Sequence, residues 1–261
     1  MNGRLEDRVA RERAAHGEDD VLARSYVLKK RFSHILVTPG LKEMERVIEK
    51  LSSGMRGSRV LDFGCGKGEM VLSYLAAGAR QVDGIDISAT YVAEAQARCQ
   101  SAGLEKTRFT VQVMDAHALD FPDESFDWVM GRGILHHLDQ EKAVAEIRRV
   151  LKPGGQAVFM EPLADNPLLK VFRFLTPSAR TVDERPIGKQ EMAIYTRAFE
   201  SESYFFGLFQ APVAMVTSLI IPSRPDNVFL RWAHGAEEIF RKRGWLNTWH
   251  QYVLLVLRKP A

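Results

Sequence analysis

Short apolar runs alternate with segments of helical periodicity between residues 59 and 161. Apolar runs of strand length occur at residues 59–63, 81–86, 108–114, 126–130 and 156–161. Between them, apolar side chains recur at helical spacing in residues 67–77, 89–102 and 141–151. Strands that alternate with helices in this way form a parallel sheet with helices on both faces. The pattern therefore predicts a doubly wound α/β domain.

The segment before the first strand is predicted to be helical. Residues 1–20 are polar and almost without an apolar stripe, which indicates either a frayed arm or a helix that orders against cofactor, substrate or another subunit. Residues 21–53 have helical periodicity, with Thr38-Pro39 as a helix start. We therefore predict an N-terminal helical arm or lid at residues 1–55 and a main domain at residues 56–261.

The rhythm changes after residue 161. Residues 162–200 hold amphipathic helical stretches and are predicted to form a substrate cap inserted after the fifth strand. Residues 204–209 and 251–257 are predicted as two closing strands, separated by helical material at residues 228–243. These strands complete a predicted seven-stranded, mostly parallel sheet.

Composition restricts the class of protein. The 261 residues are 46% hydrophobic and 26% charged with a formal charge of +3, so a nucleic-acid partner is not expected. Two cysteines, Cys65 and Cys99, make neither a disulfide framework nor a metal site, and we predict no metal. The charged N-terminal residues lack a secretory hydrophobic region, and the longest apolar run, residues 211–222, is shorter than a bilayer span. These features predict a cytoplasmic protein with no stable membrane insertion.

A glycine loop follows the first predicted strand. Asp62 leads Gly64, Gly66 and Gly68, and a second acid, Asp86, ends the next strand. Glycines let the backbone pass close to a ligand, while an acid at the neighbouring strand end accepts hydrogen bonds from ribose hydroxyls. The third glycine of a dinucleotide fingerprint is replaced by Glu69, which would repel a diphosphate, and no Gly-Lys-Ser/Thr follows. The ligand is therefore predicted to carry a ribose and no phosphate.

Further landmarks occur in order through residues 58–161. They are the Met114-Asp115-Ala116 segment, Phe126-Asp127-Trp128-Val129, Leu135-His136-His137-Leu138 and Leu151-Lys152-Pro153-Gly154-Gly155. With the glycine loop, this set resembles the type 11 group of class I S-adenosylmethionine (SAM) methyltransferases over about two fifths of the chain. The resemblance implies a Rossmann-like fold, SAM as the cofactor with S-adenosylhomocysteine as its product, and a transferase of small-molecule biosynthesis.

The resemblance also implies roles for residues of the cofactor site. Asp62 would order the loop, Asp86 would hold the ribose hydroxyls, and Asp115 would accept a hydrogen bond from the adenine amine. The remaining implied cofactor residues are Gly64, Cys65, Gly66, Ile87, Met114, Ala116 and Gly131, with Arg132 and Tyr26 as donors to the methionine carboxylate.

Methyl transfer requires a base only if the accepting atom must lose a proton. His136 follows the fourth predicted strand and Glu161 ends the fifth. Both are predicted as catalytic residues, with structural roles as the alternative. The segment from residue 162 to residue 209 is rich in aromatic side chains, which indicates either core packing or an apolar or aromatic acceptor. Predicted substrate contacts are His137, Phe172, Tyr195 and Tyr204.

The leading hypothesis is methyl transfer to a small, apolar or aromatic metabolite. The alternatives are methylation coupled to another reaction such as cyclisation, and a non-catalytic SAM-binding partner subunit. Two further alternatives concern partners: a homo-oligomer formed through the N-terminal arm, and peripheral membrane association through the apolar stripe at residues 168–175.

Overall fold

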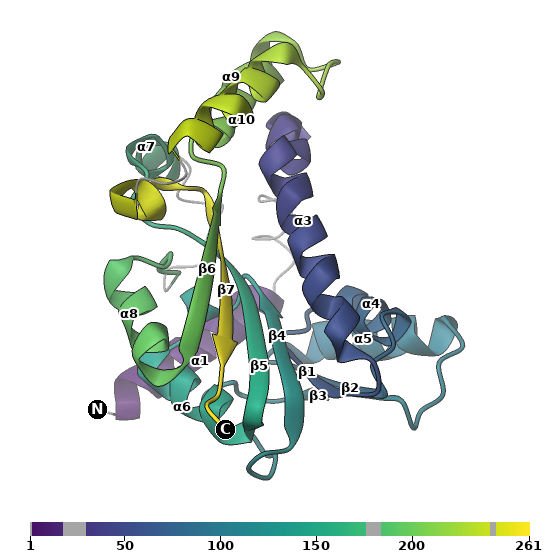
Figure 1. Cartoon of the computed structure of the whole chain (residues 1–261). Helices are drawn as coiled ribbons and strands as arrows, with labels where there is room; N and C mark the ends of the chain where they lie inside the picture. Colours follow the sequence, from purple (N-terminus) through teal and green to yellow (C-terminus); the bar gives the residue numbers. More distant parts are fainter. Residues whose placement is uncertain (1, 18–29, 176–183, 241–243) are drawn as a thin grey trace.

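The structure, a computed structural model, describes residues 2–17, 30–175, 184–240 and 244–261. Seven strands form one sheet in the order β3-β2-β1-β4-β5-β7-β6 (Figure 1). Neighbours from β3 to β5 are parallel, whereas β7 is antiparallel to β5 and β6. The strands are β1 (Arg59–Phe63), β2 (Gln81–Asp86), β3 (Phe109–Val113), β4 (Phe126–Arg132), β5 (Leu151–Pro162), β6 (Glu200–Phe206) and β7 (Tyr252–Arg258). The predicted seven-stranded, mostly parallel sheet is confirmed.

Helices cover both faces of the sheet. The first half of the chain supplies α1 (Asn2–Gly17), η1 (Ser33–Val37), α3 (Pro39–Ser52), η2 (Ser53–Met55), α4 (Glu69–Ala76) and α5 (Ala89–Ser101). The second half supplies η3 (Leu135–His137), α6 (Gln140–Val150), α7 (Pro167–Leu175), α8 (Lys189–Ala198), α9 (Gln210–Ile220), α10 (Val228–Phe240) and η5 (Gly244–Trp249). One core cluster joins α3, α4 and α5 to the sheet, and the other joins α6 and α8 to its opposite face. Strand side chains alternate between these clusters, as the pleat requires.

Two predicted helix starts have the expected caps. Thr38 Oγ1 accepts a hydrogen bond from the Leu41 N–H at 3.3 Å at the start of α3. Ser88 Oγ does the same for the Tyr91 N–H, also at 3.3 Å, at the start of α5. A capping oxygen satisfies one of the N–H groups that the first helical turn leaves without an intrahelical partner.

Strand β5 begins earlier than the sequence pattern predicts. The Lys152–Gly155 segment has the composition of a helix end that precedes the strand, but β5 starts at Leu151, directly after α6. Its register against β4 shifts between the Phe126 and Trp128 pairings, which accommodates the extra residues as an irregularity. Gly154 supports this turn of the backbone with a φ of +73°.

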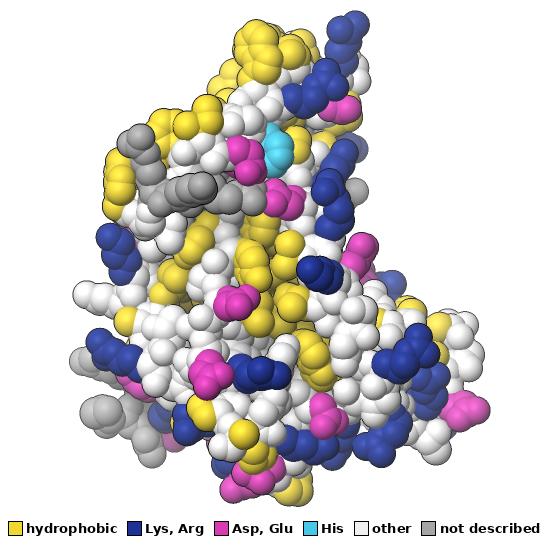
Figure 2. Space-filling model, viewed as in Figure 1, with side chains coloured by type: hydrophobic (Ala, Val, Ile, Leu, Met, Phe, Trp, Pro, Cys, Tyr) yellow, Lys and Arg dark blue, Asp and Glu magenta, His cyan; other side chains and the backbone are white. Residues whose placement is uncertain are grey.

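The chain makes two helical excursions after β5. The first, predicted from the sequence, contains α7 and α8; the second, α9 and α10, lies between β6 and β7 beyond the end of the sheet (Figure 1). The sequence predicts helix only near α10, and β6 ends three residues earlier than its predicted counterpart. Apolar side chains gather around this second excursion in the space-filling view (Figure 2). None of the helices that the structure describes is both long and apolar enough to cross a lipid bilayer.

Candidate functional site

The glycine loop turns sharply at the end of β1. Gly64 and Gly66 have φ values of +80° and +51°, in the left-handed region that side chains disfavour. A Cβ on Gly64 would stand 2.7 Å from Ile134 Cγ1, so a larger residue would displace the segment after β4. The Gly64 and Cys65 N–H groups both donate to the Ile85 carbonyl, at 3.0 and 2.8 Å. The loop is thereby fastened to the end of β2.

Asp86 is held in place by the loop it faces. Its Oδ2 accepts a hydrogen bond from the Gly66 N–H and its Oδ1 accepts one from the Ser88 N–H, each at 2.9 Å. A carboxylate offers about four acceptor positions. These two backbone bonds therefore orient the side chain and leave acceptor capacity for the pair of vicinal hydroxyls of a ribose.

Asp62 is a buried acid beneath the loop. Only 3% of the residue is exposed, and its Oδ2 has no hydrogen-bond partner among the described residues. Burial, and secondarily the charge of Asp86, raises the pKa of Asp62 to about 7, against the opposing effect of Arg132. A cationic ligand group bound near the loop would favour the ionised form of this carboxyl.

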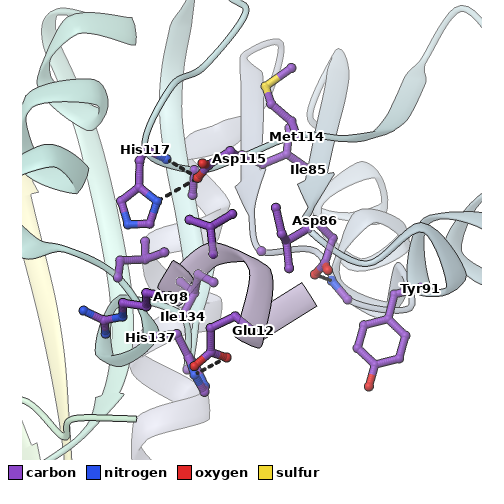
Figure 3. Close-up of a pocket in the computed structure, with 17 residues that line it drawn as sticks. Arg8, Glu12, Ile85, Asp86, Tyr91, Met114, Asp115, His117, Ile134 and His137 are labelled. Atoms are coloured by element: carbon purple, nitrogen blue, oxygen red, sulfur yellow. Dashed lines mark hydrogen bonds and ion pairs between the residues drawn. The ribbon is translucent and has the colours of Figure 1, made fainter. Parts of the chain in front are cut away.

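Gly64, Gly66 and Asp86 border a pocket at the carboxyl ends of β1, β2 and β3 (Figure 3). This is the edge at which open parallel sheets bind ligands. The lining consists of Arg8, Val9, Glu12, Gly64, Gly66, Ile85, Asp86, Ile87, Tyr91, Met114, Asp115, Ala116, His117, Gly133, Ile134, His137 and Leu138. Seven of the residues predicted to bind cofactor are in this set: Gly64, Gly66, Asp86, Ile87, Met114, Asp115 and Ala116.

Asp115 and His117 form a fixed hydrogen-bonded unit in the pocket wall (Figure 3). Asp115 Oδ1 accepts from the His117 N–H at 2.9 Å and lies 2.7 Å from His117 Nδ1. His117 Nε2 accepts from the Asp139 N–H at 2.9 Å, so Nδ1 carries the proton. Burial opposes ionisation of Asp115, but the two bonds from His117 outweigh it and lower the pKa of Asp115. Asp115 is therefore an ionised acceptor, as the predicted contact with an adenine amine requires.

His136 and Glu161 form a buried pair behind the pocket. His136 Nδ1 lies 2.7 Å from Glu161 Oε2, and neither residue lines the pocket. Burial disfavours the charged imidazole, but the hydrogen bond and charge of Glu161 outweigh it and raise the pKa of His136. Glu161 also accepts from the N–H groups of Ile134, Leu135 and His136, at 2.9, 2.8 and 3.4 Å. Four donors therefore occupy the four acceptor positions of its carboxylate.

This geometry changes the interpretation of the two predicted catalytic residues. Glu161 is completely buried and holds the segment after β4, and His136, 7% exposed, packs against it. Neither side chain faces the pocket, so the structure gives no support for direct proton transfer by either. Both are better described as positioning residues.

His137, predicted as a substrate contact, is the histidine that enters the pocket. Its Nδ1 lies 3.1 Å from Glu12 Oε2, and both residues line the cavity (Figure 3). Glu12 and its neighbours Arg8 and Val9 come from α1, and the sequence pattern identifies none of the three as a site residue. The available signal is their place in a polar helix expected to order only against something else.

Other predicted cofactor residues lie around the pocket without lining it. Cys65 is buried under the loop, and Gly131 lies within β4, where a Cβ would clash with the Phe159 ring at 2.6 Å. Arg132 forms an ion pair with Glu45 of α3 at 2.6 Å. Asp62 is likewise absent from the pocket lining, and Tyr26 lies outside the described residues.

The predicted aromatic substrate contacts are not brought to the pocket. Tyr195 is completely buried between α6 and α8, and its hydroxyl donates to Gln140 Oε1. Tyr204 lies on the edge strand β6 and donates to Glu202 at 2.8 Å. Helical and strand periodicity could not show that Tyr195 packs in the core while Tyr204 is exposed at the sheet edge. The Phe172 side chain is outside the described part of the chain.

Comparison with known proteins identifies a family of methyltransferases. A family model described as a methyltransferase domain matches residues 60–155. The chain is 38% identical over 125 residues to an S-adenosyl-L-methionine-dependent Diels-Alderase, iccD, of Talaromyces variabilis, covering 46% of this chain and 42% of that protein. It is 30% identical over 203 residues to the demethylmenaquinone methyltransferase of Symbiobacterium thermophilum, covering 76% of this chain and 72% of that protein.

Solved methyltransferase structures have a similar fold. A putative sarcosine dimethylglycine methyltransferase from Galdieria sulphuraria superposes with a TM-score of 0.61 at 17% identity, over 84% of this chain and 86% of that one. The glycine loop, Asp86 and the parallel sheet thus define the class I fold that binds a nucleoside-bearing cofactor. The chain belongs to the SAM-dependent methyltransferase family. It spans 37% to 53% of the lengths of the first four curated relatives it matches.

The residues present fit the cofactor of this family. The Asp86 carboxylate retains acceptor capacity toward the pocket, and Gly66 presents its backbone to the pocket with open space beside it. Ile85, Ile87 and Met114 supply apolar surface for a purine ring. The buried oxygen of Asp62 that has no partner among the described residues fits a ligand that carries positive charge and no phosphate.

Proposed function

We propose that this protein transfers a methyl group from SAM to a small acceptor with an apolar or aromatic surface. The observation that carries the proposal is the meeting of two sets of residues in one pocket. The glycine loop and Asp86 form one wall, and the His137–Glu12 pair forms another. A nucleoside cofactor and a proton-transferring group would thereby be adjacent.

The chain's residues would act chiefly by alignment. Asp86 would hold the ribose, Asp115 the adenine amine, and the glycine loop the amino-acid end of SAM. The bound cofactor supplies the activated methyl group, so the protein contributes orientation and exclusion of water. Helix α1 would exclude water, because its residues Arg8, Val9 and Glu12 line one side of the pocket.

His137 would accept a proton from the methyl acceptor. Its Nδ1 faces Glu12, and Nε2 would be the nitrogen that exchanges the acceptor's proton. The Glu12 carboxylate would stabilise the imidazolium that forms, at a separation of 3.1 Å. Val9, Ile134 and Leu138 provide apolar surface beside this pair, which supports an acceptor with a hydrocarbon or ring surface.

The test combines cofactor binding with product analysis. Titration calorimetry should detect SAM binding that Asp86→Ala abolishes. Isotope-labelled SAM, presented with a panel of phenols, quinols and heterocycles, should then yield labelled product. His137→Asn and Glu12→Gln should lower turnover with at most a small change in SAM affinity. His234→Asn, on α10 and outside the pocket, is the matched histidine control. Equal loss of turnover in that control would refute the assignment of His137.

A second candidate is cyclisation in a SAM-binding pocket. It is favoured by the identity to the Diels-Alderase, which covers 46% of this chain. Product mass separates the two, because methyl transfer adds a methyl group and releases S-adenosylhomocysteine whereas cyclisation preserves both substrate mass and SAM. The intact Gly64, Gly66 and Asp86 disfavour the alternative of a non-catalytic partner subunit.

A further inference from the structure

One end of the molecule exposes a large apolar surface. We call this end the helical lobe and define it as α7, α9, α10 and η5. Its large exposed hydrophobic side chains are Leu168, Val171, Phe174, Val216, Leu219, Ile220, Val228, Phe229, Trp232, Ile239, Trp245 and Trp249. They are most of the large exposed hydrophobics that the described residues contain, and Figure 2 shows the part around α9 and α10 as one yellow region. A contiguous apolar surface of this kind marks an interaction site.

Helix α9 is unusual for a helix in contact with water. Its eleven residues, Gln210–Ile220, include no charged side chain. Its buried positions pack on α10 and η1, while Val216, Leu219 and Ile220 face outward with 54%, 54% and 72% of their surface exposed. A helix on a solvated surface normally turns a polar face outward. The outer face of α9 is instead apolar, which indicates that it has a partner.

A groove runs along this surface. It has a volume of about 720 Å³ and lies between α9 and α10, with Leu168 of α7 and Phe209 at its edge. Thr217 is the single polar side chain of the lining, and its hydroxyl is already bonded to His34 Nδ1 at 2.9 Å. The groove therefore offers hydrocarbon contact without hydrogen-bonding specificity. It shares no residue with the cofactor pocket.

Cationic side chains border the apolar region. Arg224 lies in the turn between α9 and α10, Arg231 precedes Trp232 on α10, and Lys170 lies between Leu168 and Val171 on α7; all three are exposed. Of the nearby acids, Glu237 is buried against Gln210, and Glu238 lies with Glu43 and His234 toward α3. Asp165 pairs with Lys170 at 3.6 Å, and Asp226 is exposed in the same turn as Arg224. Arg224 and Arg231 outnumber Asp226, so the border keeps a positive charge that is complementary to anionic headgroups.

We propose that the helical lobe docks on a phospholipid bilayer that contains anionic lipid. Ile220, Phe229 and Trp232 enter the boundary between headgroups and acyl chains, and the basic side chains contact phosphates. A single hydrocarbon chain would fill the groove but leave Phe174, Ile239 and Trp245 in water. A bilayer offers apolar contact to these side chains as well, and tryptophan is suited to its interface. This inference goes beyond methyl transfer and does not depend on it.

Vesicle binding by the full chain tests the proposal. Vesicles of phosphatidylcholine with about one third phosphatidylglycerol should pellet the protein, and pure phosphatidylcholine should pellet much less. Ile220→Glu and Trp232→Glu should each lower the binding constant about tenfold or more. Gln100→Glu, an exposed position on α5 with the same change of charge, should leave it unchanged. Arg231→Glu should weaken binding, and Lys106→Glu, remote from the lobe, is its control.

A second measurement places the contact on the lobe itself. Three of the chain's four tryptophans, Trp232, Trp245 and Trp249, are exposed there, whereas Trp128 is in the core. Brominated lipids should therefore quench most of the tryptophan emission. Absence of vesicle binding, or equal binding by the lobe and control variants, would overturn the proposal. So would equal binding to neutral vesicles, or self-association in sedimentation velocity that Trp232→Glu abolishes, because a second copy would then cover the surface. Circular dichroism melting confirms that each variant is folded.

Discussion

Replacement of Glu161 by glutamine tests how the segment after β4 is held. The change keeps the size of the side chain and removes its charge. The amide oxygen can still accept from the N–H groups of Ile134 and Leu135, which now share Oε1 at 2.9 and 2.8 Å. The amide nitrogen then replaces Oε2, where it meets His136 Nδ1 and the His136 N–H.

The size of the effect follows from these contacts. The charge-assisted bond between Glu161 and His136 is worth about 1.5–3 kcal/mol, and a neutral bond between a glutamine and the imidazole recovers part of it. The long bond from the His136 N–H is lost, because a donor now faces a donor at a site with no exposed surface. Together these changes predict a loss of about 2–4 kcal/mol from the free energy of unfolding.

The pH dependence gives the prediction a second, independent readout. In the wild type, the raised pKa of His136 means that its pairing stabilises the fold below about pH 6.5. That contribution is lost as pH rises through the folded-state pKa. In Glu161→Gln the carboxylate that raises the pKa of His136 is absent. The difference in stability between the wild type and the variant should therefore shrink as pH rises. Urea unfolding followed by circular dichroism at several pH values measures it.

A matched variant separates this effect from general loss of a carboxylate. Asp127, at the start of β4, accepts hydrogen bonds from the Arg59 N–H and from the Lys152 side chain, but a third of the Asp127 side chain is exposed. Asp127→Asn should therefore cost about 1 kcal/mol or less. If Glu161→Gln unfolds with wild-type stability while methylation collapses, Glu161 acts on the substrate and our reasoning is refuted.

Three further predictions concern the loop and the lobe. SAM affinity should rise about tenfold between pH 6 and pH 8, because binding favours ionised Asp62 whose pKa is about 7 in the free protein; calorimetry should show a flat profile in Asp62→Asn. Gly64→Ala should lower stability by about 2–4 kcal/mol through its positive φ and the contact with Ile134, whereas Gly103→Ala, at +70° in open space, should cost only about 1 kcal/mol in the same denaturation assay. Asn166→Ala removes the side chain that caps α7 and should lower the melting temperature by an amount equivalent to about 1–2 kcal/mol, with unchanged SAM affinity. The first prediction is contradicted if the SAM affinity of the wild type does not change with pH. The second is contradicted if the two glycine variants lose the same free energy of unfolding, and the third if Asn166→Ala leaves the melting temperature unchanged.

The sheet and the cofactor wall could be predicted because their signals are local. A strand-length apolar run, a glycine loop and an acid at a strand end are each contained in a few residues, and the carboxyl ends of parallel strands must meet. The amino-acid sequence alone therefore points to Asp86 and Asp115. It does not reveal their orientation by Gly66, Ser88 and His117, since that depends on backbone N–H groups that only the folded loop aligns.

The acceptor side could not be predicted in the same way. The sequence does not show which of His136 and His137 enters the pocket. Adjacent side chains of a short turn point in different directions, and contacts with residues distant in the sequence determine those directions. The His136 ring contacts Glu161, which is 25 residues away in the chain, and the His137 ring contacts Glu12 of α1. Aromatic content likewise failed as a guide, because Tyr195 fills the core between two helices that periodicity could not place together.

The position of β7 has a consequence for how the protein is made. Tyr252–Arg258 follows β6 along the chain, yet it lies inside the sheet between β5 and β6. Every strand that borders the cofactor pocket precedes residue 163, so those strands can pair while the ribosome is still extending the chain. β6 and the two helices after it gain a neighbour in the sheet only when β7 has been synthesised. The strands that border the cofactor pocket can thus pair during translation, whereas β6 must wait for β7 before it joins the sheet.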